Sequence, residues 1–494
     1  MSHLIKDNKL VVKFFRIFFY IFILITIFSG SYFYIGNKII FLIFGLLSNL
    51  IFLFIFSKKT YFFEIFFGGL LWLGFWYKSL IIIIFDNYNF KEGAGVFKSF
   101  NHNEQIQILD NSYTTICYGL AGFLLACLIK NTLLNNFFNL KKNFQENNKF
   151  LNIKILKFLL LIFIITYLTI TFSNFFLGIY QRGILPNYDI HFLISAIFKW
   201  LLLFGFSSFI AFIFIFAFKN KLNIYLLSIS SIIETFITNI SFLSRGMIFN
   251  LFAIFIGLYK SNKFYDLKIN VKLFLIYLLS IMVFFYLSVI TVNYLRANIF
   301  FIKKVPIKIT MENVQTEEKT EQKSEIKKKY NTNRKAFIEF LSLSKTRWVG
   351  IDALVAVESF KGKSFEFFKR SFKDEFNKNK YPFYEKNVQK RDKIQTNTIR
   401  YGITTPGIFA FSYYTGSQIF VFITIFLVSF LILNFEKLVF LIFNNLILCS
   451  ILSQVLAYRL IHFGYMPQNT YMLLTSILIT IMGLFLLKKL LEKN

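Results

Sequence analysis

The chain has 494 residues, 56% of them hydrophobic, with 71 phenylalanines and a mean hydropathy of +0.59. This composition excludes an ordinary water-soluble globular fold. A net charge of +30 would suggest nucleic acid as the partner of a soluble protein. Here most of the lysines lie between apolar segments, where they set membrane topology and meet anionic lipid head groups. We therefore predict membrane lipids, and no nucleic acid, as partners.

The apolar segments have the length of membrane spans, because about 20 helical residues cross a bilayer core of about 30 Å. We predict an all-α, multi-pass membrane protein with about twelve transmembrane helices. Nine lie within residues 1–295 and three within 407–494, separated by one large loop at 296–406. The predicted spans are residues 12–30, 39–56, 66–85, 113–129, 158–177, 194–218, 224–242, 247–259, 273–292, 418–434, 438–458 and 470–487.

Lysine and arginine are distributed unequally over the short connections between these spans. The connections on one side carry twenty-two of these residues and those on the other side carry five. The positive-inside rule then predicts that both termini are cytoplasmic and that the large loop after the ninth span lies outside. That loop is itself rich in lysine and arginine, but segments longer than about 60 residues translocate largely regardless of charge.

The large loop changes composition along its length. Residues 312–335 are charged and poor in apolar side chains, which predicts a flexible or weakly helical stretch. Residues 336–372 carry apolar side chains at helical spacing and predict one or two amphipathic helices that lie on the membrane surface or cap the bundle. After residue 380 the sequence is irregular, and such backbone is tolerated near membrane depth where it lines a cavity.

Three ionisable residues stand out among the spans. Arg245 lies in a Ser-Arg-Gly turn between the seventh and eighth spans, on the outer side. A guanidinium binds phosphate oxygens through two parallel hydrogen bonds, and an interfacial anchor is the alternative role. Lys78 and Glu234 lie inside spans, where an ionisable group is costly. Each is expected to face a cavity or a partner; a Lys–Glu pair, snorkelling and a substrate contact are all compatible with the sequence.

The large loop holds the other candidates for chemistry, each with ordinary solvation as its alternative. Four histidines are scattered without metal-ligand spacing, and no phosphate-binding glycine motif precedes a helix. We therefore predict no metal and no other cofactor. The loop candidates are Arg347, Trp348, Asp352, Glu358, Arg391, Arg400 and Tyr401.

The predicted arrangement is a known one. It combines cytoplasmic termini, about a dozen phenylalanine-rich spans, a large outer loop late in the chain, and arginines on the outer face. Arg391 and Gly402 fit the Arg-x10-Gly spacing described for some members of one family. The chain thus resembles the Wzy-type O-antigen and oligosaccharide repeat-unit polymerases. The related O-antigen ligases carry a histidine in the large loop, and this loop has none. Lipid-dependent glycosyltransferases carry an acid in the first outer loop, and SYFYIGNK has none. Both departures favour the polymerases.

The resemblance implies a metal-independent glycosyltransferase of lipopolysaccharide synthesis in the bacterial inner membrane. It would polymerise a polyprenyl-diphosphate-linked oligosaccharide, and a chain-length regulator is a further candidate partner. Arginines would bind the diphosphate. A carboxylate would orient or deprotonate the acceptor hydroxyl, and Asp352 is preferred over Glu358 for this role. The implied diphosphate ligands are Arg245, Arg347, Arg391 and Arg400. The aromatic residues expected to stack on sugars are Trp348, Tyr401, Tyr413 and Tyr414.

Two other classes of function fit parts of the sequence. A transporter or flippase for a lipid-linked saccharide or a small anion accounts for the spans, Lys78 and Glu234 without catalysis. The large outer loop and the lack of a visible internal repeat disfavour a transporter, because transporters place their sites near the midplane and often show internal repeats. A non-catalytic scaffold in a polysaccharide export complex is the third possibility.

Overall fold

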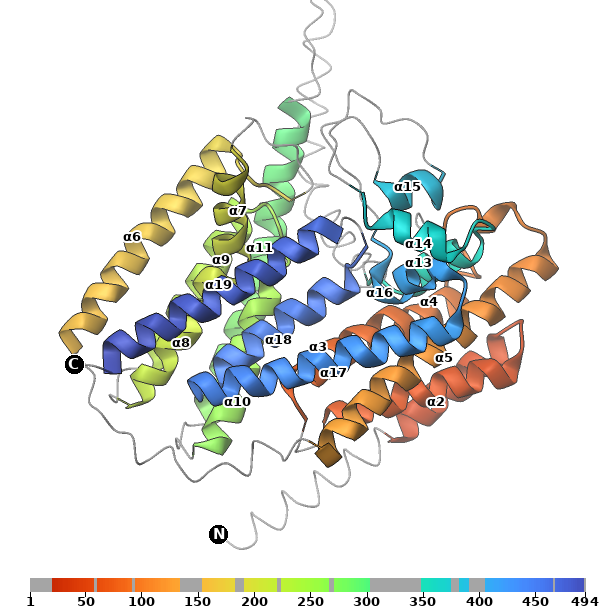
Figure 1. The fold of residues 1–494 in the computed structure, drawn as a ribbon, viewed down its shortest axis with the longest axis horizontal. Coiled ribbons are helices and arrows are strands. Elements are labelled where there is room, and N and C mark those ends of the chain that lie inside the picture. Colours follow the sequence, from red (N-terminus) through yellow and green to blue (C-terminus); the bar gives the residue numbers. More distant parts are fainter. Residues whose placement is uncertain are drawn as a thin grey trace, which may run out of the picture.

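The computed structural model is all-helical in the residues that it describes, and its helices pack into one bundle (Figure 1). Within the described residues, eight helices are long and apolar enough to cross a membrane, and two shorter ones, Tyr20–Phe33 and Leu446–Ile461, are also apolar. The count of twelve spans and the outer position of the large loop stay predictions. The described residues are 20–56, 60–90, 94–133, 153–182, 191–219, 224–265, 271–302, 348–374, 382–390, 405–464 and 467–492.

The described helices before residue 303 overlap the residue ranges of the predicted spans, with different ends. The ninth, for example, continues ten residues beyond its predicted end at residue 292. These helices are α2 (Lys38–Ile55), α3 (Phe62–Leu71), α4 (Lys78–Ile84), α5 (His102–Leu133), α6 (Ile153–Leu177), α7 (Phe192–Trp200), α8 (Phe206–Lys219), α9 (Ile224–Ser241), α10 (Ile248–Phe264) and α11 (Val271–Ile302).

Short helices from the predicted loop region lie at one end of the bundle, before the last long helices (Figure 1). Every apolar side chain of α13 is buried, so this helix belongs to the core; the fold brings it against α5 and α16. The elements are α13 (Ile351–Glu358), α14 (Phe365–Ser371), α15 (Phe383–Asn387), α16 (Gly407–Ser412), α17 (Gln418–Phe443), α18 (Leu446–Ile461) and α19 (Pro467–Glu492).

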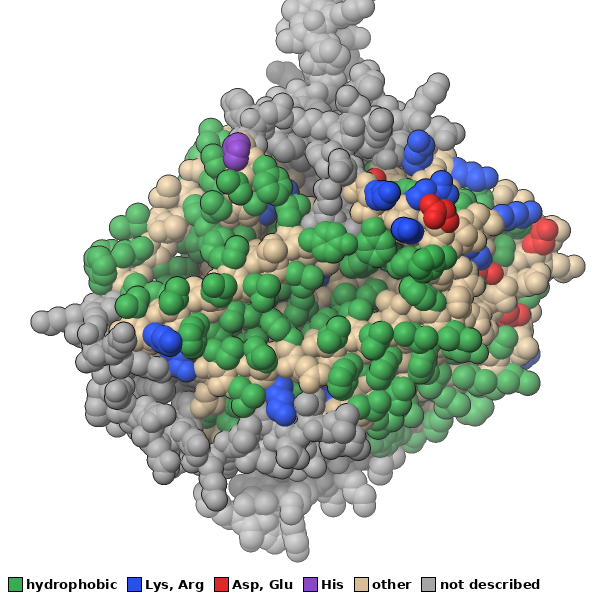
Figure 2. Space-filling view, in the orientation of Figure 1, with side chains coloured by type: hydrophobic (Ala, Val, Ile, Leu, Met, Phe, Trp, Pro, Cys, Tyr) green, Lys and Arg blue, Asp and Glu red, His purple; other side chains and the backbone are tan. Residues whose placement is uncertain are grey.

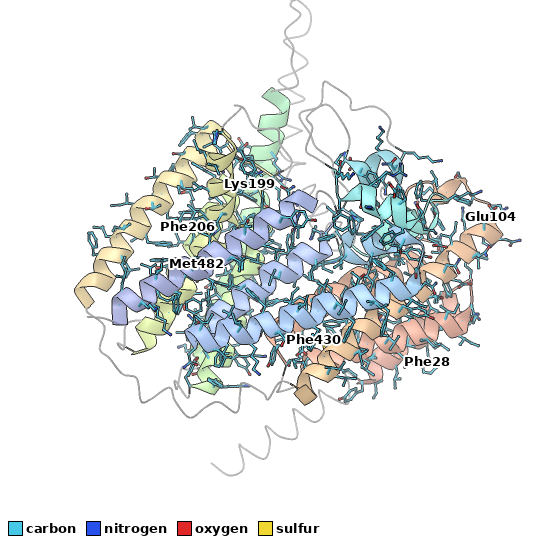
Figure 3. The ribbon with its side chains drawn as sticks, viewed as in Figure 1. Phe28, Glu104, Lys199, Phe206, Phe430 and Met482 are labelled. Carbon is cyan, nitrogen blue, oxygen red and sulfur yellow. The ribbon has the colours of Figure 1, made fainter. Side chains whose placement is uncertain are left out.

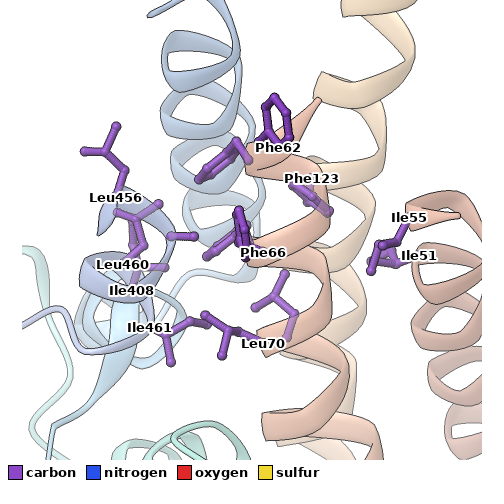
Figure 4. Close-up of a cluster of buried hydrophobic side chains, with 14 of the residues drawn as sticks. Ile51, Ile55, Phe62, Phe66, Leu70, Phe123, Ile408, Leu456, Leu460 and Ile461 are labelled. Atoms are coloured by element: carbon purple, nitrogen blue, oxygen red, sulfur yellow. The ribbon is translucent and has the colours of Figure 1, made fainter. Parts of the chain in front are cut away.

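The face shown in Figure 2 carries a broad belt of hydrophobic side chains, and lysines and arginines lie at its upper right, together with some acidic side chains, and below it. This distribution suits a bilayer, whose apolar core is flanked by charged head groups. Inside the belt the helices bury a continuous core. Figure 4 shows α3 lying between α18 and α2, with Phe66 and Leu70 of α3 facing Leu460 of α18.

Small residues allow the closest helix contacts. A Cβ atom added at Gly122 of α5 would lie 2.5 Å from the Phe422 carbonyl oxygen of α17. One added at Gly257 of α10 would lie 2.7 Å from the Ile447 Cα of α18, and next to it Ser450 Oγ donates to the Ala253 carbonyl at 2.7 Å. Close backbone approach through small residues and interhelical hydrogen bonds are the usual means of helix association in lipid.

The N-terminus of α3 is buried, and a carboxylate from a distant part of the chain satisfies it. Glu436 of α17 accepts hydrogen bonds from the backbone N–H groups of Phe62 and Phe63 at 2.8 Å each. Ser453 of α18 donates a third bond to the same carboxylate at 2.8 Å. An anion at a helix N-terminus also interacts favourably with the helix dipole. This contact holds α3, α17 and α18 together.

Two lysines balance the acidic groups around this helix end. Lys130 of α5 forms an ion pair with Glu64 of α3 at 2.7 Å, and each side chain is 1% exposed. Lys260 of α10 donates to the Thr60 carbonyl and lies over the Phe62 ring. Because each charge has an opposite charge or a hydrogen-bonding partner nearby, this buried site is stable in an apolar bundle.

The turn between the tenth and eleventh predicted spans lies later than the sequence predicted. The predicted spans end at residue 434 and begin again at 438, but Asn434 donates back to the Phe430 carbonyl and Glu436 is buried at the α3 end. The helix therefore continues to Phe443. Asn444 then takes a left-handed conformation at φ 48°, and the Asn445 side chain caps the first turn of α18.

In the part of the chain that the structure describes, two long helices contain a π-helical turn. One turn, Trp72–Tyr77, joins α3 to α4, and the other, Leu201–Gly205, joins α7 to α8. Each pair therefore forms one continuous span, Phe62–Ile84 and Phe192–Phe214 in their apolar parts. π-helical turns inside α-helices are frequent at functional sites.

We expect Gly257→Ala to destabilise the protein by about 1–3 kcal/mol, because the added methyl group meets the α18 backbone. The measurement is the thermal unfolding midpoint of the protein purified in detergent. Gly483→Ala on α19 is the matched control, since a Cβ there meets nothing within 4 Å. An equal midpoint for both variants would contradict the close α10–α18 contact.

Candidate anion-binding site

Five basic residues meet at the end of the bundle where α9 turns into α10. Arg182 follows α6, Arg245 lies in the α9–α10 turn, Arg296 is on α11, Arg459 is on α18 and Lys199 is on α7. We call these five residues the arginine cluster. Figure 3 labels Lys199 on this side of the molecule and the exposed Glu104 of α5 on the opposite side.

Arg182 is at the centre of the cluster. Its guanidinium lies over the Tyr458 ring, 5.3 Å from the centroid, and its Nη1 donates to Ser244 Oγ at 3.3 Å. Its backbone carbonyl accepts from Arg296 Nη2 at 2.7 Å, and its backbone N–H donates to the Phe242 carbonyl at 2.9 Å. The residue is therefore held in place from both its backbone and its side chain.

The α9–α10 turn is shaped to admit the Arg182 side chain. A Cβ atom added at Gly246 would lie 2.7 Å from Arg182 Nη1, so a larger residue at this position would displace that guanidinium. Ser244, whose hydroxyl accepts from Arg182, also accepts from the Gly246 N–H at 3.2 Å. Arg245 stands between these two residues, and its Nε and Nη1 atoms are buried.

The remaining members of the cluster approach from α18 and α7. Arg459 Nε donates to Thr470 Oγ1 of α19 at 2.9 Å, and the Arg459 and Arg182 guanidiniums repel each other. Lys199 Nζ lies 4.8 Å from the centroid of the Tyr180 ring. Burial raises the pKa of Tyr180, and the positive charges of Arg182 and Arg459 oppose that rise.

Several positive charges in one partly buried site disfavour one another unless an anion joins them. In the described part of the chain, neither Arg182 nor Lys199 forms an ion pair with an aspartate or glutamate. Guanidinium groups bind phosphate oxygens through charge-assisted hydrogen bonds. The arrangement is therefore suited to a multiply charged anion such as a diphosphate.

Lys78, predicted to face a cavity or a partner, is paired with Asp352. The Lys78 ammonium forms an ion pair with Asp352 Oδ2 and donates to the Trp348 carbonyl at 2.8 Å. The π-helical turn before Lys78 brings Gly74 against Gly350, where a Cβ on either residue would strike the backbone of the opposite segment. Burial raises the pKa of Asp352, and the Lys78 charge opposes the rise.

One carboxylate oxygen of Asp352 is available to a further hydrogen-bonding partner. Its Oδ1 atom is buried and accepts no hydrogen bond from the residues that the structure describes. Glu358, at the other end of α13, accepts from Lys363 Nζ at 2.5 Å and from Asn111 Nδ2 at 3.0 Å. Both predicted carboxylates are thus paired with a lysine, and only Asp352 retains a buried oxygen without a donor.

Some of the other predicted site residues lie within the described part of the chain and some lie outside it. Arg245 is in the arginine cluster, while Arg347, Arg391, Arg400 and Tyr401 lie outside the described residues. Among the aromatic candidates, Trp348 is partly buried and its carbonyl is bonded to Lys78. Tyr413 lies under Lys363, with 5.0 Å between Nζ and the ring centroid, and Tyr414 is fully buried against Phe367 and Phe411.

Sequence reasoning missed four members of the cluster: Arg182, Lys199, Arg296 and Arg459. A usable signal was present for the arginines. The chain has only ten arginines, and four of them follow or terminate helices that end on the same predicted side. In a sequence that strongly favours lysine, arginines at one set of helix ends indicate a need for the guanidinium group itself.

In comparisons with known proteins, no family model, curated protein or solved structure matched this chain.

We expect Lys78→Met to destabilise the protein by about 3–5 kcal/mol, because Asp352 is left as a buried charge without a cation. Adding Asp352→Asn should restore most of the loss. Since protonation also neutralises Asp352, the defect of the single variant should shrink as pH falls. Thermal unfolding in detergent at several pH values measures all three effects. A single variant as stable as the wild type would show that the ion pair is unimportant.

We expect Arg182→Lys to weaken binding of inorganic pyrophosphate at least about tenfold, because loss of one charge-assisted hydrogen bond costs about 1.5–3 kcal/mol. Calorimetric titration of the purified protein measures it. Arg370→Lys, at an exposed position of α14, is the control and should bind as the wild type does. Equal affinities for both variants would argue against anion binding at the cluster.

Proposed function

We propose that the protein is a membrane glycosyltransferase that polymerises polyprenyl-diphosphate-linked oligosaccharide repeat units at the outer face of a bacterial inner membrane. The observation that carries the proposal is the arginine cluster. It lies where several apolar helices end, which is the depth at which a lipid-linked diphosphate meets the membrane surface. The hydrophobic belt provides the surroundings that the polyprenyl tail requires.

In the proposed reaction, an acceptor sugar hydroxyl attacks the anomeric carbon of the donor. The bond from that carbon to the diphosphate oxygen breaks, and its electron pair leaves with the diphosphate. Arg182, Arg245 and Arg459 would stabilise this charge without a metal ion. Of the predicted loop arginines, Arg347, Arg391 and Arg400 stay as further candidates for the same task.

The proton of the acceptor hydroxyl requires a base. Asp352 is the preferred candidate, because Lys78 holds Oδ2 while Oδ1 is buried and accepts no bond among the described residues. Burial of this carboxyl raises its pKa and so its basicity. Glu358, with bonds from Lys363 and Asn111, is better suited to positioning α13.

A second candidate function is supported by Glu234. This carboxyl is 4% exposed in the middle of α9, and transporters place functional acids at such depths. A flippase for the same lipid-linked saccharide would also need the arginine cluster. The two functions differ in their product. Loss of a polymerase leaves single repeat units at the cell surface, whereas loss of a flippase leaves none.

The test is surface-glycan analysis of a deletion strain of the source organism, complemented with variants at matched membrane levels. The wild type should restore a ladder of repeat units. Arg245→Lys should shorten or abolish the ladder, because the charge stays but the paired hydrogen-bond geometry is lost. Arg370→Lys should restore it fully. A deletion strain without any surface repeat unit would favour the flippase, and a full ladder from Arg245→Lys would remove the diphosphate role.

A further inference from the structure

Glu234 lies in a polar pocket between α6, α8 and α9. Ser207 Oγ of α8 is 3.3 Å from each carboxylate oxygen, Thr235 Oγ1 is 3.3 Å from Oε2, and Thr238 Oγ1 is 3.3 Å from Oε1. Tyr167 of α6 donates to the Glu234 backbone carbonyl at 2.8 Å. The side chain is therefore surrounded by hydroxyl groups.

These contacts are long for an ionised carboxylate, which shortens O–H···O⁻ bonds to about 2.5–2.7 Å. The hydroxyl groups also have other partners. Thr235 Oγ1 donates to the Ser231 carbonyl at 2.9 Å, and Thr238 Oγ1 lies 3.4 Å from Tyr167 Oη. The pocket therefore offers weak solvation to a negative charge.

Glu436 provides the internal comparison. It is as deeply buried, but it accepts two backbone N–H groups and the Ser453 hydroxyl, all at 2.8 Å, with Lys260 in its electrostatic surroundings. In the described part of the chain, the side chain of Glu234 accepts no backbone N–H group and has only hydroxyl groups at 3.3 Å as partners. Among the described residues, the titratable groups that face Glu234 are the phenols of Tyr167 on α6 and Tyr277 on α11, and no lysine, arginine or second carboxyl pairs with it.

An unpaired carboxylate in the apolar interior of a membrane protein is strongly disfavoured, so a bound cation must neutralise it. We propose that Glu234 is a proton-binding site, holding a proton at neutral pH and exchanging it with the solution. The proposal does not depend on the glycosyltransferase assignment.

A row of buried polar groups leads from this site towards the arginine cluster. Ser241 Oγ donates to the Thr171 carbonyl at 2.7 Å, and Asn174 Nδ2 donates to the Ser241 carbonyl at 2.8 Å. The Asn174 Oδ1 atom accepts from the Tyr180 N–H at 2.8 Å. Tyr180 is two residues before Arg182. The row of polar groups therefore connects the buried Glu234 with the end of the bundle, and it offers a polar route for proton exchange with the solution.

The test uses a hydrophobic carbodiimide, which reacts with protonated carboxyl groups in apolar surroundings, on the full chain in lipid nanodiscs. Peptide mass spectrometry assigns the modified residue. We expect Glu234 to be labelled far more strongly than Glu436 at neutral pH, because the three hydrogen bonds that Glu436 accepts at 2.8 Å favour its ionised form. Labelling should fall as pH rises, because the proton exchanges with the solution.

Two controls make the result decisive. Glu234→Gln should lose the label but keep the wild-type unfolding midpoint, because the amide resembles the neutral acid. Replacing potassium with sodium in the buffer should not protect Glu234. Equal labelling of Glu234 and Glu436, labelling independent of pH, or protection by sodium would each overturn the proton site. The measurement involves no glycan, so its outcome is separate from that of the polymerase test.

Discussion

The buried N-terminus of α3 imposes the strongest constraint on this bundle. Its first backbone N–H groups point into a region where water cannot satisfy them. Glu436, 374 residues away from Phe62 in the sequence, satisfies two of them, and Ser453 fixes the same carboxylate from α18. The Lys130–Glu64 pair adds α5 to the assembly. Helices from both ends of the chain must therefore meet before this charge is stabilised, which makes the bundle one cooperative unit.

The two ends of the bundle use charge in opposite ways. Around α3, the acids Glu64 and Glu436 meet lysines, so the charges are balanced within the protein. In the arginine cluster, cations from five segments gather and Arg182 repels Arg459. Balanced charges stabilise a fold, whereas gathered like charges gain from an external ion. This contrast is the reason to look for structural roles at the first end and for ligand binding at the second.

The sequence was sufficient for the helical class and for most long helices, because each needs only a run of apolar residues. It located Arg245 as a candidate, since a short turn between two spans leaves few places for a guanidinium. It did not locate the α17–α18 turn: Asn434 and Glu436 look like turn residues until Phe62 is known to lie beside them. The pairing of Lys78 with Asp352 depends likewise on two segments 274 residues apart. Contacts of this kind are set by the tertiary fold and leave no local pattern.

The π-helical turn Trp72–Tyr77 has a consequence for how this site tolerates change in chain length. Such a turn contains one residue more than an α-helical turn, and each helical residue rotates the following side chains by about 100°. Removing one residue there would restore a regular helix while turning Lys78 away from Asp352. The extra residue therefore sets the angular position of everything after it in the span. Insertions and deletions, more than substitutions, are the changes to which this part of the protein is sensitive.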